Sequence, residues 1–283
     1  MDYDDWTTEQ HETTVTVDGH DLTVAYYEAG TDNDGPPIVL LHGIPTSSFL
    51  WRNVIAALAE DRHVIAPDLL GYGNSSMYDG FDRSIRAQEL MVKDLTGTIG
   101  ASTISLVGHD IGGGVALRVA SHSPESVEQL VLSNAVCYDS WPLDLVVEIG
   151  LPTVLEEAPE KLDQLLEAAF SEEFMAATPE DAFVEGMHAP WGSDEGRLSL
   201  VRNAAALNTN HTTELAYRAI SAETLLLWGA DDFAQSITNA ERLAEDLSDA
   251  RVVELADAGH WVMEDRMEAY VDHVHSFFGR STH

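Results

Sequence analysis

Ten residues near the middle of the chain constrain the fold more than any other stretch: Ser105-Leu-Val-Gly-His-Asp-Ile-Gly-Gly-Gly114. The β-branched and apolar run at 103–107 is typical of a buried strand, and small and apolar residues at helical spacing follow it. Gly108 and Gly112 flank the junction, because so sharp a turn leaves no room for side chains on either side. The sequence therefore predicts a strand, a tight turn and a helix, with Asp110 exposed at the tip.

Hydrophobic patterning predicts that strands and helices alternate along most of the chain. The run from Thr13 to Tyr27 alternates about Asp18-Gly19, which is typical of a hairpin. Short buried strands are predicted at 38–41, 64–66, 103–107, 129–133, 224–228 and 251–255. Helices are predicted from Ser47 or Ser48 to Leu58, and at 84–99, 113–122, 238–247 and 263–278. Such alternation is typical of an α/β fold with a mostly parallel central sheet flanked by helices.

The strand pattern stops between Cys137 and Tyr217. Leucine and aromatic residues recur there at mostly helical spacing, interrupted by prolines. We therefore expect three parts, namely a first core segment at 1–136, a helical insertion at 137–217 after the sixth strand, and a second core segment at 218–283.

The net charge is the most unusual bulk property of the chain. There are 49 acidic and 14 basic residues, a formal charge of −35, and the acids are spread along the whole length. Self-repulsion on this scale destabilises a compact state in dilute buffer, and molar salt screens it. Such a surface resembles that of proteins from halophiles that accumulate salt, such as haloarchaea. It is also a poor partner for nucleic acids and anionic membranes.

The remaining composition favours a cytoplasmic protein. No apolar run approaches the roughly 18 residues of a membrane span, and the acidic N-terminus does not match a signal peptide. Cys137 is the one cysteine, so no internal disulfide can form. We expect the high-salt cytoplasm of a halophile. The oligomeric state is left open, a homo-oligomer included.

Polar residues follow four of the predicted strands: His42-Gly43, Asp110, Asp231-Asp232 and His260. The carboxyl ends of parallel strands meet at one edge of a sheet, so these residues are expected to lie together. An aspartate is already ionised at neutral pH and is a nucleophile without an activating base. Its attack on an acyl carbon gives an anhydride, whereas its attack on an sp3 carbon gives an alkyl ester. Asp110 therefore favours epoxides or alkyl halides over esters and peptides.

These residues resemble the α/β-hydrolase family over the whole length of the chain. The matching parts are the His42-Gly43-Ile44-Pro45 loop, the turn around Asp110, the Gly229-Ala-Asp-Asp232 segment and Gly259-His260. Nucleophile, acid and histidine follow one another in the order of that family. HGIPTSSFLWRN together with an aspartate at the turn is similar to the branch of epoxide hydrolases and haloalkane dehalogenases. The helical insertion then corresponds to the family's cap domain.

The resemblance implies an enzyme that works through a covalent ester on Asp110. His260 would activate a water to hydrolyse that ester, and Asp232 would orient the histidine. The backbone N–H groups of Ile44 and Ile111 would form the oxyanion hole. Asn134 stands where some dehalogenases carry their acid, which leaves Asp232 for that role. The resemblance implies a small-molecule substrate and water, with no cofactor and no metal.

The groups that would handle the leaving group depart from the family pattern. Haloalkane dehalogenases usually hold the halide with side chains at the positions of Ile111 and Ile44, and neither isoleucine can donate a hydrogen bond. The candidates in the cap for this task are Trp141 and Trp191 as indole donors, and His188, Tyr138 and Tyr217 as proton donors. An epoxide is slightly favoured because it needs one proton donor and no halide cage. A haloalkane, an ester or lactone, and a ligand-binding protein without activity remain alternatives.

Overall fold

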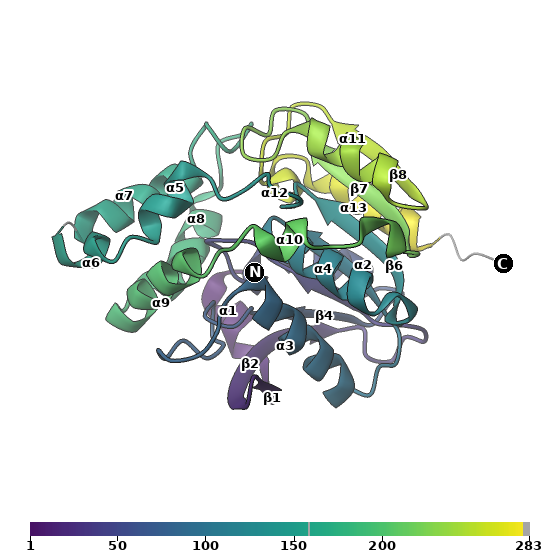
Figure 1. Ribbon diagram of the computed structural model, residues 1–283, viewed down its shortest axis with the longest axis horizontal. Helices are drawn as coiled ribbons and strands as arrows, with labels where there is room; N and C mark the ends of the chain where they lie inside the picture. The colour runs from purple at the N-terminus through teal and green to yellow at the C-terminus, as the bar shows by residue number, and fades with distance from the viewer. Residues whose placement is uncertain (158, 280–283) are drawn as a thin grey trace.

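An eight-stranded sheet lies at the centre of the molecule (Figure 1). A computed structural model describes residues 1–157 and 159–279. The strand order is β1-β2-β4-β3-β5-β6-β7-β8, with β2 antiparallel to both neighbours and β3 to β8 parallel. The strands are β1 His11–Val17, β2 His20–Ala29, β3 Ile38–Leu41, β4 Val64–Pro67, β5 Ile104–His109, β6 Val127–Ser133, β7 Glu223–Gly229 and β8 Ala250–Leu255. The predicted α/β fold with a mostly parallel sheet is confirmed.

The first two strands form the predicted hairpin. Val17 pairs with His20, so the connecting turn consists of Asp18 and Gly19 alone. Both have positive φ, 49° and 83°, as a two-residue turn matched to the twist of the strands requires. The parallel strands that follow cannot be joined in this way, because each needs a crossover connection.

Helices supply these crossovers. Those of the core are α1 Tyr3–Thr8, α2 Arg52–Leu58, α3 Ile85–Thr98, α4 Ile111–His122, α11 Ile237–Asp246, α12 Val262–Asp265 and α13 Met267–Phe278. Ser84 caps α3 by accepting a hydrogen bond from the backbone N–H of Ala87. Helix α4 begins two residues earlier than its sequence pattern predicts, and the last predicted helix is divided at Arg266.

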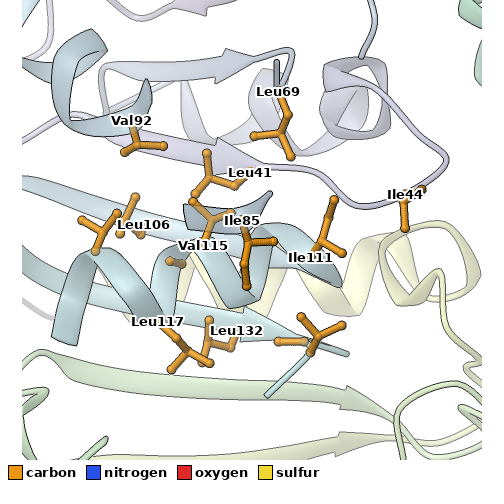
Figure 2. Close-up of a cluster of buried hydrophobic side chains, with 14 of the residues drawn as sticks. Leu41, Ile44, Leu69, Ile85, Val92, Leu106, Ile111, Val115, Leu117 and Leu132 are labelled. Carbon is orange, nitrogen blue, oxygen red and sulfur yellow. The ribbon is translucent and has the colours of Figure 1, made fainter. Parts of the chain in front are cut away.

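Both faces of the sheet are covered because the parallel strands are apolar on both sides. In β3, Val39 and Leu41 belong to the cluster under α3, α4 and α11, whereas Ile38 and Leu40 face α2 and α13. Figure 2 shows part of the first cluster, with Leu41, Leu106 and Leu132 on the strands. Side chains that alternate between two apolar layers explain why these strands read as unbroken apolar runs.

Helix α1 was not predicted from the sequence. Asp2 accepts a hydrogen bond from the N–H of Asp5 and so caps its first turn. Its one buried side chain, Trp6, stacks on Tyr27 of β2 with ring centroids 4.0 Å apart. Two aromatic residues in six, Tyr3 and Trp6, are too few to establish a helical period, so their packing rather than a pattern fixes this helix.

The chain between β6 and β7 forms helices and no strand over its described residues. We call residues 137–217 the helical insert (teal to green in Figure 1). Its helices are α5 Asp144–Ile149, α6 Thr153–Glu157, α7 Pro159–Ala169, α8 Asp181–His188, α9 Asp194–Ala205 and α10 Asn210–Thr213. Over the described part of the chain, no helix combines the length and the apolar character needed to cross a membrane.

Candidate active site

Asp110 occupies the sharp corner between β5 and α4. Its φ and ψ are 51° and −124°, a region that residues with a side chain rarely adopt and that marks functional corners. A Cβ on Gly112 would lie 2.3 Å from the carbonyl oxygen of Leu41, and one on Gly108 would lie 2.6 Å from that of Gly112. The glycines therefore permit the close approach of α4 to β3 and β5. The side chain of Asp110 is buried, at 6% exposure, beneath the helical insert.

The carboxylate of Asp110 is held by the loop that follows β3. The N–H of Ile44 donates to Asp110 Oδ2 over 2.9 Å, and the N–H of Ile111 also hydrogen-bonds the carboxylate. A Cβ on Gly43 would lie 2.6 Å from that of Asp110, so glycine lets the loop close onto the acid. Burial raises the pKa of Asp110, and the charge of His260 and the two N–H groups only partly offset this.

His260 lies beside Asp110 and is oriented by Asp232. Its Nδ1 is 3.0 Å from Asp232 Oδ2, while Asp232 Oδ1 accepts from the N–H of Ala234 over 2.7 Å. Burial alone would lower the pKa of His260, but the charge and hydrogen bond of Asp232, followed by the charge of Asp110, raise it above the usual value. The three side chains predicted to act together are thus adjacent.

Asn134 supports the same acid. It follows β6 with a φ of 47° and is fully buried. Its Nδ2 donates to Asp232 Oδ2 over 2.5 Å, and its Oδ1 accepts from the N–H of Gly229 over 3.3 Å. Asn134 cannot itself be the acid, but its hydrogen bonds hold in place Asp232, the acid that follows β7.

Two hydrogen bonds join the helical insert to the two sides of this site. On one side, Trp191 Nε1 donates to the carbonyl of Pro45 over 2.9 Å, next to Ile44. On the other side, the N–H of His260 donates to the carbonyl of Phe174 over 2.8 Å. The insert is thus attached both to the loop that holds Asp110 and to the loop that carries His260.

The carboxylate of Asp265 strengthens the second attachment. It accepts from the N–H of Gly259 over 2.8 Å, and from the N–H groups of Ala176 and Ala177 over 3.0–3.1 Å. One acidic side chain on α12 therefore ties the histidine loop to the insert. The sequence pattern did not mark it.

The other two histidines near the site have structural contacts. His42 Nε2 accepts from the N–H of Leu69 over 3.0 Å, and its Nδ1 lies 2.9 Å from the carbonyl of Gly43. Burial lowers the pKa of His42 to about 4, so the ring is neutral and shapes the loop after β3. His109 Nδ1 bonds to the carbonyl of Ser133, and burial followed by the charge of His260 lowers its pKa well below the usual value.

Asp110 and His260 open into a narrow cavity between the strand ends and the helical insert. Ile44 and Ile111 form its wall next to the carboxylate, and Figure 2 shows both side chains at the edge of the apolar cluster. Most of the remaining wall is apolar: Pro45, Val136, Trp141, Pro142, Leu143, Leu145, Val146, Ile149, Ala169, Phe174, Leu207, Ala234 and Trp261. The one further polar side chain among the described lining residues is Gln235.

The cap candidates are placed differently from what the sequence suggested. Trp141 lines the cavity, but its indole N–H donates to Thr212 over 2.8 Å, and the N–H of Trp191 is bound to Pro45. Tyr138 and Tyr217 are not in the lining, since their hydroxyl groups donate to Asp246 and to the carbonyl of Thr212.

His188 lies behind the cavity wall. Its ring packs against Phe170 at 5.6 Å between centroids, and Phe170 packs in turn against Trp261. The buried Nε2 of His188 has no hydrogen-bond partner among the described residues, but His188 is not part of the cavity lining.

Gln235 is the polar lining residue that the sequence did not predict. It stands three positions after Asp232, in the turn between β7 and α11, where no motif marks it. A polar residue among apolar neighbours in the loop that carries the acid was the available signal. No three His, Cys, Asp or Glu side chains within residues 1–157 and 159–279 are grouped so that they could hold a metal ion.

Comparison with known proteins places this geometry in context. A cis-3-alkyl-4-alkyloxetan-2-one decarboxylase of Shewanella oneidensis is 27% identical, over 87% of this chain and 83% of its own. Haloalkane dehalogenase 2 of Mycobacterium tuberculosis is 28% identical, over 90% of this chain and 91% of its own. A soluble epoxide hydrolase of a Corynebacterium species is 30% identical, over 88% of this chain and 92% of its own.

The fold and the family agree. The crystal structure of an alpha/beta hydrolase fold protein from Burkholderia ambifaria superposes with a TM-score of 0.81 at 26% identity, covering 94% of this chain and 98% of the other. The family model for the alpha/beta hydrolase fold matches residues 36–266, most of the chain. The chain therefore belongs to the alpha/beta hydrolase fold family.

Proposed function

We propose that the protein hydrolyses a small apolar electrophile through an alkyl ester on Asp110, with an epoxide as the substrate class. The observation that carries this proposal is the carboxylate at the corner between β5 and α4, which faces an apolar cavity beside His260. Relatives whose names include an epoxide hydrolase and a haloalkane dehalogenase support it.

In the first step an oxygen of Asp110 attacks an sp3 carbon of the substrate. The carboxylate is the reactive form, and the N–H groups of Ile44 and Ile111 hold one side of it. The apolar wall excludes water from the attacked carbon and retains the alkyl part of the substrate by burial. The product of this step is an ester on Asp110, with the leaving group still in the cavity.

In the second step a water attacks the carbonyl carbon of that ester. Neutral His260 takes the proton of the water, and Asp232 stabilises the resulting imidazolium. Negative charge then develops on the oxygen that faces the N–H of Ile44. Collapse of this intermediate breaks the ester bond to the alkyl oxygen, which takes the proton from the His260 imidazolium and leaves as the alcohol, while the carboxyl group of Asp110 gives its proton to solvent.

A halide is a less favourable leaving group for this cavity. Holding a desolvated halide requires N–H donors that point at it. The indole N–H groups of the lining residues Trp141 and Trp261 donate to Thr212 and to the carbonyl of Ala169.

A strained lactone is a second candidate. Opening an oxetan-2-one at its alkyl carbon releases a carboxylate, which needs no proton, whereas opening an epoxide releases a basic alkoxide. No tyrosine or other side-chain acid besides Asp110 and His260 occurs among the described lining residues. The relative from Shewanella oneidensis takes its name from an oxetan-2-one.

We also propose that the protein works in a high-salt cytoplasm. The supporting observation is the formal charge of −35 over 283 residues. Most of the few arginine and lysine side chains are already paired with carboxylates, so solution cations have to screen the remaining acids.

Trapping the ester tests the proposed reaction. The His260→Gln variant, which lacks the base for the second step, is incubated in molar KCl with terminal epoxides, 1-haloalkanes and a 3,4-dialkyl oxetan-2-one. Intact-mass measurement should show one added substrate mass from an epoxide, located on the peptide that contains Asp110. The matched Asp110→Asn,His260→Gln double variant should show none.

The alternatives give different outcomes in the same experiment. An adduct only from haloalkanes would show a dehalogenase, and one only from the lactone would select the second candidate. Turnover of esters by the wild-type protein without any adduct in the variant would exclude a covalent alkyl ester. Tight binding without turnover would indicate a binding protein.

A further inference from the structure

The leaving group lacks an obvious partner in this cavity. When Asp110 attacks a carbon, the electron pair of the breaking bond moves to the departing atom, on the far side of that carbon from Asp110. The N–H groups of Ile44 and Ile111 are occupied by the carboxylate itself. A donor for the departing atom has to come from another part of the wall.

Gln235 is the lining side chain that can supply it. It is 2% exposed, and its main chain is fixed because Trp228 Nε1 donates to its carbonyl over 2.8 Å. Its side-chain contacts are long: Nε2 to the carbonyl of Ser140 at 3.5 Å, and Asn239 Nδ2 to Oε1 at 3.3 Å. A carboxamide carries two N–H donors, so one N–H has no partner among the described residues.

The loop that carries Gln235 is the loop that carries the acid. The N–H of Ala234, one residue earlier, binds Asp232 Oδ1 over 2.7 Å. The same short turn thus sets the positions of Asp232 and Gln235. Burying an amide in a wall that is otherwise apolar is costly unless its hydrogen bonds are used, which points to a polar atom of the substrate as the missing partner.

Resting on the covalent mechanism proposed above, we propose that Gln235 binds the departing oxygen and so makes the cavity selective for oxygen leaving groups. The bond from Asp110 to carbon forms, the carbon–oxygen bond breaks, and the electron pair stays on the oxygen, which accepts a hydrogen bond from Gln235 Nε2. No proton is transferred, because an amide is not an acid at neutral pH. An alkoxide takes its proton from water, and a carboxylate needs none.

This role predicts a dependence on leaving-group basicity. The hydrogen bond strengthens as negative charge concentrates on the departing atom, so it is worth most for an alkoxide, less for a carboxylate and least for a large halide. A residue that only fills space would affect all substrates alike.

The experiment measures the rate of ester formation in the His260→Gln background, by intact mass in molar KCl. Gln235→Leu keeps the approximate volume and removes the amide. It should slow ester formation about 10²-fold with a terminal epoxide, several-fold with a 3,4-dialkyl oxetan-2-one and by less than about twofold with 1-iodobutane. Val146→Ala, which changes an apolar part of the cavity wall, should change the three rates in an order that does not follow the basicity of the leaving group.

One further variant keeps the outcomes distinct. Gln235→Glu also removes the neutral N–H donor, so it should slow ester formation with the same dependence on the leaving group as Gln235→Leu. A defect of Gln235→Leu that came from misfolding would not be shared by Gln235→Glu. Equal slowing of all three substrates, or none, would overturn the role of Gln235 while leaving the ester mechanism intact. Absence of any ester in the His260→Gln parent would overturn the mechanism and this inference together.

Discussion

The two walls of the cavity are built in opposite ways. On the wall formed by the strand ends, Asn134 and His260 are both hydrogen-bonded to Asp232, over 2.5 and 3.0 Å, and the N–H of Ile44 holds the carboxylate of Asp110 over 2.9 Å. On the wall formed by the helical insert, the facing side chains are apolar, and the N–H of Trp141 is turned to Thr212. Under the proposed function, the first wall carries out the chemistry, whereas the second selects substrates by shape. We therefore expect substitutions in the first wall to change rate constants and substitutions in the second to change substrate range.

The largest loss should follow Asp110→Asn. Without the carboxylate no ester can form, and the rate should fall by about 10⁴-fold or more. Stability should be retained or rise, because the variant removes a buried charge and asparagine tolerates positive φ. Turnover and thermal melting measured on the same preparation test both parts. A melting temperature lowered by several degrees would show that the carboxylate is part of what stabilises the fold.

A smaller loss, about 10³- to 10⁴-fold in ester hydrolysis, should follow Asp232→Asn. In the wild-type protein, the rate of hydrolysis should rise with pH, because neutral His260 is the base. The charge and hydrogen bond of Asp232 raise the pKa of His260 and persist in the ester, whereas the charge of Asp110 is removed when the ester forms. The variant loses the largest contribution that raises this pKa, so its midpoint should move to lower pH. Single-turnover decay of the ester from pH 5 to 9 measures this shift, and an unchanged midpoint would contradict the pairing.

A loss of about tenfold is expected for Asp265→Ala. This variant frees the N–H groups of Gly259, Ala176 and Ala177 and loosens the histidine loop. Ester formation should keep its rate, whereas ester hydrolysis should slow, so the ester accumulates during turnover. Asp272→Ala is the matched control, because it removes one exposed acid from the next helix. Equal slowing of both steps would indicate a general loss of structure.

The smallest expected effect is that of salt on local stability, and it should differ between the helical insert and the strands. The helical insert has sixteen acidic residues against three basic ones within 81 residues, a higher density of negative charge than the rest of the chain. Molar KCl screens this repulsion. Amide hydrogen exchange should therefore slow more in the insert than in the strands when KCl is raised from 0.05 to 2 M, while the melting temperature rises. A flat response would exclude the proposed adaptation to salt.

The strand-end wall could be predicted from the sequence, because each of its residues directly follows a strand that a short stretch of sequence reveals. The turn around Asp110, with its flanking glycines, is fixed by the steric limits on five consecutive residues. The rule that parallel strands end at one edge brought the Asp231-Asp232 pair and His260 together, and the resemblance to the family selected Asp232 and implied both roles.

The insert wall could not be predicted, because it depends on partners distant in the sequence. The indole N–H of Trp141 was expected to face the substrate, but it bonds to Thr212, 71 positions away. Gln235 and Asp265 lie on the strand-end side but contact the helical insert, at Ser140 and at Ala176 and Ala177, and no sequence period records such contacts. Composition shows that a wall is apolar, but not which of its few polar groups remain free.

The hydrogen bonds of Trp191 and Phe174 to the loops on either side of the site have a consequence for substrate entry. Trp191 binds the carbonyl beside Ile44, and Phe174 binds the N–H of His260. An insert that lifts to admit a substrate has to release these bonds or to carry both loops with it. In the second case the donor to Asp110 and the base move together with the gate. Under the proposed mechanism the site is then complete only when the insert is closed, so an electrophile that reaches an open form would meet Asp110 without the N–H of Ile44 and without His260.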